Sequence, residues 1–147
     1  MIEYIFQVAT VWFLGFFPFF EIYVAVPAGM AVGLDPFSVI FFSVTGNFAP
    51  VLLIEFGYHQ LRRIERLRRW FDRPVSEKLT TNINRYGWWY ILLITPWVGV
   101  WAIAVAAKVL HMNRDTLVWG SLVSILIYAL VLTGLIALGI DFFSDDA

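Results

Sequence analysis

The sequence has 147 residues, of which 61% are hydrophobic, 18% aromatic and only 14% charged, with a formal net charge of −1. Soluble domains average roughly 45–50% apolar and about 25% charged residues, so this composition predicts an all-α integral membrane protein that crosses the cell membrane more than once. The near-neutral charge gives no bulk attraction to nucleic acid, and the absence of cysteine excludes disulfides, thiolate metal sites and cysteine nucleophiles. The N-terminal segment begins with an acid, Glu3, and has no basic residue beside it. A secretory signal has a basic start, so we expect the N-terminal segment to be retained.

The first apolar block divides into a broken segment and a full span. Residues 37–58 are long enough to cross the hydrocarbon core, which takes about 20 apolar residues. Within residues 4–33, Pro18, Glu21 and Pro27 interrupt the pattern. The remaining arms are too short to cross a core of ~30 Å at ~1.5 Å per residue. We therefore predict a re-entrant hairpin over about 4–33, with a kinked full span as the alternative.

The polar segment 59–87 carries eight of the ten Lys and Arg residues, which places it in the cytoplasm. Apolar residues recur in it at helical spacing and predict an interfacial amphipathic helix. These residues are Leu61, Ile64, Leu67 and Phe71. Pro74 suits the first turn of a second helix. The arginines around the apolar stripe either only orient the protein or also contact anionic headgroups, the candidates being Arg62, Arg66 and Arg69.

Residues 88–147 repeat the order of the first block. In residues 88–107, Pro96 lies near the middle and Gly99 follows, which predicts a second re-entrant hairpin, again with a kinked span as the alternative. Residues 115–140 are long enough for a second full span, and an acidic tail follows.

These elements predict an inverted repeat of two units, each a re-entrant helical hairpin followed by a transmembrane helix. The units are residues 1–58 and 88–147, and the basic amphipathic cytoplasmic loop 59–87 joins them. With both hairpins re-entrant, all ten basic residues face the cytoplasm, as the positive-inside tendency prefers. An offset of 78 residues aligns few identical residues, among them Pro18 with Pro96 and Ser43 with Ser121. Inverted repeats with broken helices are a recurring transporter design, with the binding site near the midplane.

Three polar residues in the apolar blocks are candidates for transport or proton coupling. Glu21 lies at the expected hairpin tip, where an acid is costly, and it either carries a proton between two access states or caps the second arm. Asn47 either satisfies the carbonyl that Pro50 frees, a role Thr45 could share, or binds substrate, or pairs with Glu21. Glu55 lies near the cytoplasmic end of its span, where snorkelling to the interface explains it adequately, with proton coupling as the alternative.

A second group of residues is expected to shape the hairpins or line a substrate path. This group comprises Pro18, Pro27, Gly29, Pro96, Gly99 and Trp101. Gly29 belongs to a ridge of small residues spaced by four, for which helix packing is the main interpretation. Trp101, like Trp97, either lines an apolar path or packs against the other hairpin. Lys108 joins the headgroup candidates, and the two histidines lack neighbours that would complete a metal site, so we expect no metal.

Two motifs resemble the small multidrug export protein family, which is related to DedA-like membrane proteins. The first is Pro18-x-x-Glu21-x-x-x-Ala25-x-Pro27-x-Gly29-x-x-x-Gly33, followed by Gly46-Asn47-x-x-Pro50. The second is Tyr86-Gly87, then Thr95-Pro96 and Trp101, with a run of small residues to Lys108. The second departs from the polar Gly-Thr-Gly-Ala-Trp-like tip of the family. The resemblance covers about residues 18–140 and implies a small transporter with two re-entrant hairpins. DedA-like proteins are linked to polyprenyl-phosphate lipid carriers and to the proton-motive force.

We therefore expect a small, proton-coupled membrane transporter that moves an amphipathic substrate, such as a polyprenyl-phosphate lipid carrier or a small drug-like compound. The alternative is a non-transporting membrane scaffold or assembly factor, which the glycine ridge and the amphipathic helix would serve. Signatures of an enzyme are missing, so we expect no catalytic activity and no cofactor. The expected partners are membrane lipids, a proton or another cation, and a second copy of the chain, because so small a bundle buries few faces.

Overall fold

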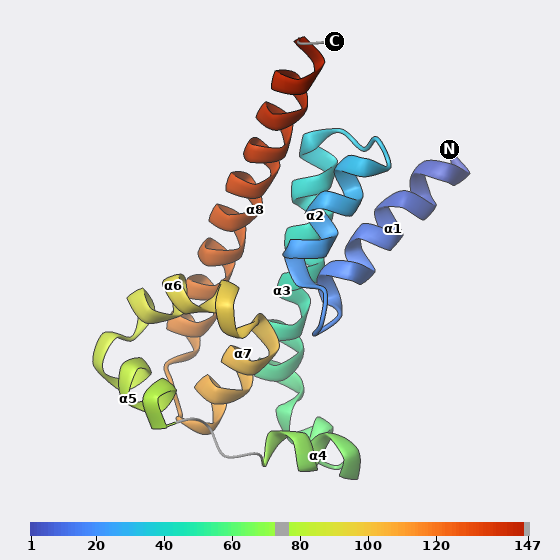
Figure 1. The fold of residues 1–147 in the computed structure, drawn as a ribbon. Coiled ribbons are helices and arrows are strands. Elements are labelled where there is room, and N and C mark those ends of the chain that lie inside the picture. Colours follow the sequence, from blue (N-terminus) through green and yellow to red (C-terminus); the bar gives the residue numbers. More distant parts are fainter. Residues whose placement is uncertain (73–76, 146–147) are drawn as a thin grey trace. The chain divides into compact units, whose positions relative to one another are not determined.

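The computed structural model describes residues 1–72 and 77–145, and its regular elements within these ranges are all helices. They are α1 (Ile2–Phe16), α2 (Glu21–Ala31), α3 (Pro36–Leu61), α4 (Glu65–Phe71), α5 (Glu77–Tyr86), α6 (Trp88–Val98), α7 (Val100–Val109) and α8 (Arg114–Asp145) (Figure 1). The all-α prediction is confirmed. The helix start expected at Pro74 and the end of the acidic tail (Asp146) lie outside the described residues.

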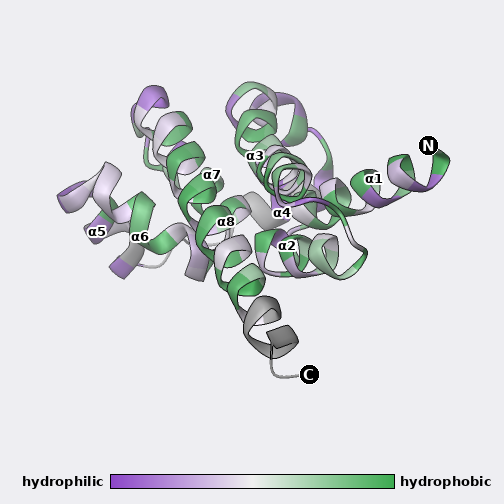
Figure 2. Cartoon of the chain, turned by 90° about the horizontal axis from the view of Figure 1, so that it is seen from above, coloured by the Kyte–Doolittle hydropathy of each residue, from purple (hydrophilic) through white to green (hydrophobic). Residues whose placement is uncertain are grey.

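Within the described residues, two helices are long and apolar enough to cross a membrane, as predicted. They are α3 and the part Arg114–Gly139 of α8, each 26 residues long. Figure 2 shows hydrophobic residues along α3 and α8, whereas α5 is mainly hydrophilic. The start of α3 is capped by Asp35, whose Oδ1 accepts a hydrogen bond of 3.0 Å from the backbone N–H of Ser38. The hydroxyl and backbone N–H of Ser38 together lower the pKa of this exposed carboxyl.

The polar segment is organised differently from the prediction. Leu61 is the last residue of α3, and its side chain packs against the buried cluster around Ile54. Three residues of turn follow, and α4 begins only at Glu65. Ile64 precedes α4 and is exposed. The expected amphipathic helix is therefore divided between the end of α3 and a short α4.

The chain forms two compact units. Unit 1 comprises Met1–Asn47 and Ile125–Ala147, and unit 2 comprises Phe48–Ser124. The long helices α3 and α8 thus each contribute one part to each unit. Every contact described below lies within one unit.

In unit 1, α1 and α2 lie side by side as a helical hairpin (Figure 1). The turn Phe17–Phe20 joins them, and Pro27 lies inside α2 rather than at a break. At the opposite end of the hairpin, the Gln7 amide donates to the Val32 carbonyl over 3.0 Å. The two outer ends of the hairpin are therefore held together.

Glycines allow α1 to cross α3 at backbone distance. A Cβ atom on Gly15 would lie 2.8 Å from the Ser43 carbonyl oxygen, and a Cβ on Gly46 would overlap the Trp12 carbonyl. Real Cβ atoms do not approach backbone this closely, so only glycine fits at these two positions. The short distance between α1 and α3 gives both helices additional dispersion contacts.

In unit 2, the hairpin of α6 and α7 breaks at Gly99 and not at Pro96. Gly99 has φ +91° and ψ 144°, a conformation that residues with a Cβ rarely adopt, whereas Pro96 lies inside α6. A proline cannot donate to the carbonyl four residues earlier, here that of Leu92. The Ser124 hydroxyl of α8 donates to this Leu92 carbonyl over 2.8 Å, so helix α6 continues past its proline.

We predict that Gly46→Ala lowers the free energy of unfolding by about 1–3 kcal/mol, because the new methyl group collides with the α1 backbone. Thermal unfolding of the purified protein in detergent measures the effect. Gly134→Ala in α8 is the matched control, since no described atom lies within 4 Å of its Cβ position. Alanine there should be neutral or stabilising by up to ~1 kcal/mol. Equal destabilisation by the two substitutions would contradict the crossing.

Candidate functional site

Glu21 combines burial with an unusual backbone conformation. It is the first residue of α2, only 7% of it is exposed, and its φ is +50°. Its backbone N–H donates to the Phe17 carbonyl over 3.3 Å, which closes the turn between α1 and α2. A residue with a Cβ at positive φ costs on the order of 1–3 kcal/mol and persists only where the surroundings require it. Such outliers cluster at functional sites.

Two buried side chains on one face of α3 carry oxygen atoms without hydrogen-bond partners among the described residues. They are Ser43 Oγ and Asn47 Oδ1, in residues that are 0% and 2% exposed. Thr45 does not serve the carbonyl freed by Pro50, since its hydroxyl donates to the Phe41 carbonyl over 2.7 Å. Buried polar atoms are normally paired, so each unpaired oxygen requires an explanation.

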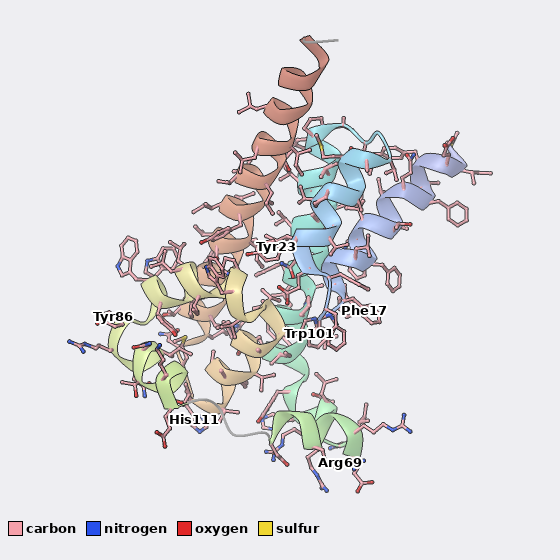
Figure 3. The ribbon with its side chains drawn as sticks, viewed as in Figure 1. Phe17, Tyr23, Arg69, Tyr86, Trp101 and His111 are labelled. Carbon is pink, nitrogen blue, oxygen red and sulfur yellow. The ribbon has the colours of Figure 1, made fainter. Side chains whose placement is uncertain are left out.

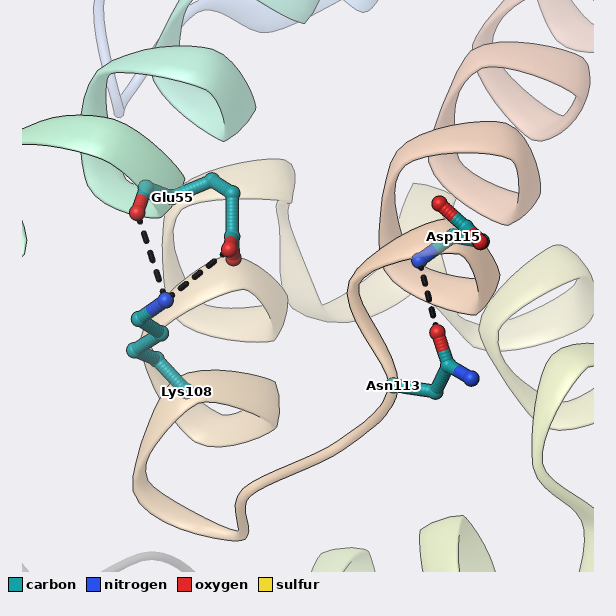
Figure 4. Close-up of polar contacts among 4 residues, drawn as sticks. All are labelled: Glu55, Lys108, Asn113 and Asp115. Atoms are coloured by element: carbon teal, nitrogen blue, oxygen red, sulfur yellow. Dashed lines mark hydrogen bonds and ion pairs between the residues drawn. The ribbon is translucent and has the colours of Figure 1, made fainter.

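In unit 2, Glu55 of α3 and Lys108 of α7 form an ion pair (Figure 4). Lys108 Nζ lies 2.9 Å from Glu55 Oε1 and also donates to the Glu55 carbonyl over 3.2 Å. The side chains are 10% exposed for Glu55 and 27% for Lys108, so the pair is largely shielded from solvent. Two residues considered for separate roles in the sequence thus neutralise each other.

The ion pair lies beside an apolar cluster that packs α3 against α7. Ile54, Ala104 and Val105 form its buried centre, and Trp101 packs against them together with Tyr58 and Leu61. In the same part of α3, the Arg114 guanidinium lies 4.6 Å from the centroid of the Phe56 ring. Trp101 therefore packs within its own unit, whereas Trp97 is 82% exposed.

The loop arginines differ in their surroundings. Arg62 pairs with Asp72 over 2.8 Å, and its guanidinium lies 5.7 Å from the Tyr58 ring centroid. Arg66 and Arg69 are exposed on α4 (Figure 3). Among the three arginines considered for headgroup contact, these two are exposed and have charge available for contacts outside the chain.

The remaining path candidates divide between surface and interior. Pro18 and Pro27 are exposed, and Pro96 and Gly99 are half-buried. Gly29 is buried, and a Cβ on it would lie 2.9 Å from Val39 and 3.1 Å from Val11, which assigns it to packing. The sequence analysis did not foresee an open apolar groove of about 370 Å³ along α1. Its lining includes Phe6, Phe13, Phe17 and Phe20.

The described residues contain no group of three His, Cys, Asp or Glu side chains that could hold a metal ion. A sequence model of the family described as "Putative small multi-drug export protein" matches residues 21–131. The chain belongs to this family. The match includes Glu21 itself and both long helices up to Val131. No curated protein and no solved structure matches the chain.

Family membership and two helices that could cross a membrane together indicate a membrane protein. The family is one of export proteins and not a known enzyme family. The first resemblance motif begins at Pro18, and the matched range starts within it, at Glu21. The recognition from sequence is therefore confirmed.

We predict that Lys108→Met lowers the free energy of unfolding by about 1–3 kcal/mol, because it leaves the shielded Glu55 carboxylate without its cation. Adding Glu55→Gln to Lys108→Met should recover most of the loss, since neither partner then carries a buried charge. A double-mutant cycle from thermal unfolding in detergent measures the coupling, which we expect at about 0.5–3 kcal/mol. Additive effects of the two substitutions would show that the pair does not form.

Proposed function

We propose that the chain is a small, proton-coupled transporter of the cell membrane that moves an amphipathic substrate. The observation that carries the proposal is the Glu21 carboxyl, buried at the broken end of a short helix in an export-family protein. Acids at membrane depth are costly and generally functional. Proton uptake and release by such a carboxyl, between two access states, would couple the proton gradient to substrate movement.

The proposed architecture is a repeat of hairpin and span at an offset of 78 residues. The starts of the two long helices correspond, because Pro36 of α3 aligns with Arg114 of α8. The hairpin breaks also correspond, because Glu21 at φ +50° aligns with Gly99 at φ +91°. Both residues donate their N–H to the carbonyl four residues earlier.

The turns that lead into the two long helices support the same offset. Gly33 and His111, which the offset aligns, both have positive φ, +82° and +53°. Three backbone hydrogen bonds around each turn correspond in donor and acceptor. They run from residues 32, 33 and 34 to the carbonyls of 28, 30 and 29, and from residues 110, 111 and 112 to those of 106, 108 and 107. Such bonds are typical of a common helix C-terminal motif, and their occurrence at the same offset as the hairpin breaks supports the repeat.

The inverted orientation follows if each repeat crosses the membrane once. A hairpin that returns to its own side adds no crossing, so the single span of the first repeat would leave the second repeat upside down. The joined ends of the α1–α2 hairpin, at Gln7 and Val32, support a return to the same side. This topology also keeps all the basic residues in the cytoplasm.

The substrate is proposed to be a polyprenyl-phosphate lipid carrier or a small drug-like compound. The phenylalanine-lined groove along α1 suits an apolar chain or ring system. Arg66 and Arg69 suit a phosphate headgroup at the cytoplasmic surface. Several apolar side chains of α8 are exposed, among them Leu130, Leu135 and Leu138, which leaves a surface for lipids or for a second copy in a homodimer.

The scaffold alternative cannot be tested through Gly29. Any side chain there would displace Val11 and Val39, so Gly29→Leu would disturb unit 1 whichever function is correct. Glu21→Gln keeps the size of the side chain and removes only the charge and the proton. It therefore separates transport from scaffolding.

We predict that proteoliposomes containing the wild-type protein move a substrate across the bilayer when a pH gradient is imposed, and that Glu21→Gln abolishes this movement. A fluorescent polyprenyl phosphate and a cationic dye serve as probes in separate assays. Glu3→Gln is the matched control, because Glu3 is an exposed acid of the same unit and should not matter.

Movement of neither probe by the wild type would contradict transport of these two classes and favour the scaffold. Movement that Glu21→Gln and Glu3→Gln leave equally intact would remove Glu21 from the mechanism. A response to only one probe would select between the two substrate classes.

A further inference from the structure

Two of the unpaired buried oxygens in the described part of unit 1, those of Ser43 and Asn47, form a short polar row on α3, and a third, Thr133 Oγ1, lies on α8. Ser43 and Asn47 are one helical turn apart, and residues at this spacing have Cβ atoms ~5–6 Å from each other on one face. Both side chains are more than nine-tenths buried, and neither Ser43 Oγ nor Asn47 Oδ1 has a hydrogen-bond partner among the described residues. Leaving such atoms unsatisfied is costly, so a ligand that contacts both would be stabilised.

A backbone oxygen lies in the same turn. Pro50 lies inside α3 and has no N–H, so it cannot donate to the Gly46 carbonyl four residues earlier. Thr45 does not replace this bond, because its hydroxyl donates to Phe41. Carbonyls freed at helix irregularities are common ligands for alkali cations in transporters.

Helix register brings the Glu21 carboxyl to the level of this row. The short connection between α2 and α3 makes them antiparallel neighbours, and Gly29 of α2 lies against Val39 of α3. Eight residues back along α2 is Glu21, and eight residues forward along α3 is Asn47. Each stretch of eight residues is about 12 Å long, so Glu21 and Asn47 lie at the same level along the two helix axes.

Helix α1 covers the polar row. A Cβ on Gly15 would lie 2.8 Å from the Ser43 carbonyl and 3.1 Å from the Asn47 backbone nitrogen, so the α1 backbone lies directly over this part of α3. The row is thereby separated from lipid, and a small ion fits this arrangement better than an organic ligand.

We propose that unit 1 holds a sodium ion, bound by Ser43 Oγ, Asn47 Oδ1 and the Gly46 carbonyl, with the Glu21 carboxylate supplying the compensating charge. All of these donors are oxygen atoms, which hard cations prefer. One carboxylate neutralises one monovalent charge, whereas a divalent ion would leave net charge in a site of low dielectric constant. Zinc and copper prefer imidazole nitrogen or sulfur ligands, and neither is present in this set.

Sodium would act as a coupling ion of the transporter, so this role rests on the proposed function. The binding itself does not depend on transport. It is measured on purified protein in detergent, by equilibrium binding of radioactive sodium in a choline chloride background. The wild type should bind one sodium ion per chain in a saturable way, and sodium should raise its unfolding temperature more than choline does.

Removing the ligands one at a time tests the assignment. Ser43→Ala and Asn47→Ala should each weaken sodium binding about tenfold or more, since each removes one oxygen ligand of the sodium ion. Glu21→Gln should abolish it. Thr45→Val is the matched control, because it also removes a hydroxyl from α3, but one already bonded to the Phe41 carbonyl, and binding should change less than twofold.

Absence of saturable sodium binding by the wild type overturns the proposal, and the polar row then holds only water. If sodium binding is unchanged in Ser43→Ala, Asn47→Ala and Glu21→Gln, the ion binds elsewhere and the assignment of these ligands is wrong. The wild-type measurement needs no variant to fold, so it remains decisive if a substitution destabilises the chain. Sodium binding without substrate movement would contradict only the proposed function, and substrate movement without sodium binding would contradict only this site.

Discussion

Four apolar helices among the described residues are too short to cross a bilayer, and the rest of the structure depends on how their ends are accommodated. Helices of 15, 11, 11 and 10 residues (α1, α2, α6 and α7) reach at most about 22 Å, against a hydrocarbon core of ~30 Å. A helix end in lipid exposes unpaired backbone groups, so it has to be covered by protein. The close crossing at Gly15 and Gly46 and the bond from Ser124 to Leu92 meet this need, because they bring α1 onto α3 and α8 onto α6.

The same constraint explains where polar residues are found. Apolar side chains satisfy lipid, so each buried polar group has to be matched by another group or by a ligand. Glu55 and Lys108 match each other, and Ser124 serves the carbonyl that Pro96 leaves free. Among the described residues, the side-chain oxygens of Ser43, Asn47, Ser121 and Thr133 remain unmatched. All of these except that of Ser121 lie in unit 1, which also buries Glu21. Unit 1 is therefore where an ion or a proton is most expected.

The two long helices could be predicted from the sequence, because an apolar run of about 20 residues is typical of a helix that crosses a membrane. The sequence identified Glu21 because an acid in such a run is costly. It named Pro96 and Gly99 for the second hairpin without deciding between them, and the break is at Gly99, since a serine distant in sequence allows the helix to pass the proline. The pairing of Glu55 with Lys108 could not be predicted, because 53 residues separate them and only tertiary packing joins them. Leu61 was misassigned for the same reason, as its partners lie partly on α7.

The central claim is that α1 and α2 form a hairpin that returns to the side it entered from. The chain has no cysteine, so single cysteines can be introduced at Glu3 and Val32, which flank the hairpin, and at His59 as a reference. Labelling intact cells with a membrane-impermeant maleimide measures which positions face outward. The account predicts that positions 3 and 32 are labelled alike and position 59 is not. Labelling of only one of positions 3 and 32 would show that the segment crosses the membrane and would contradict the account.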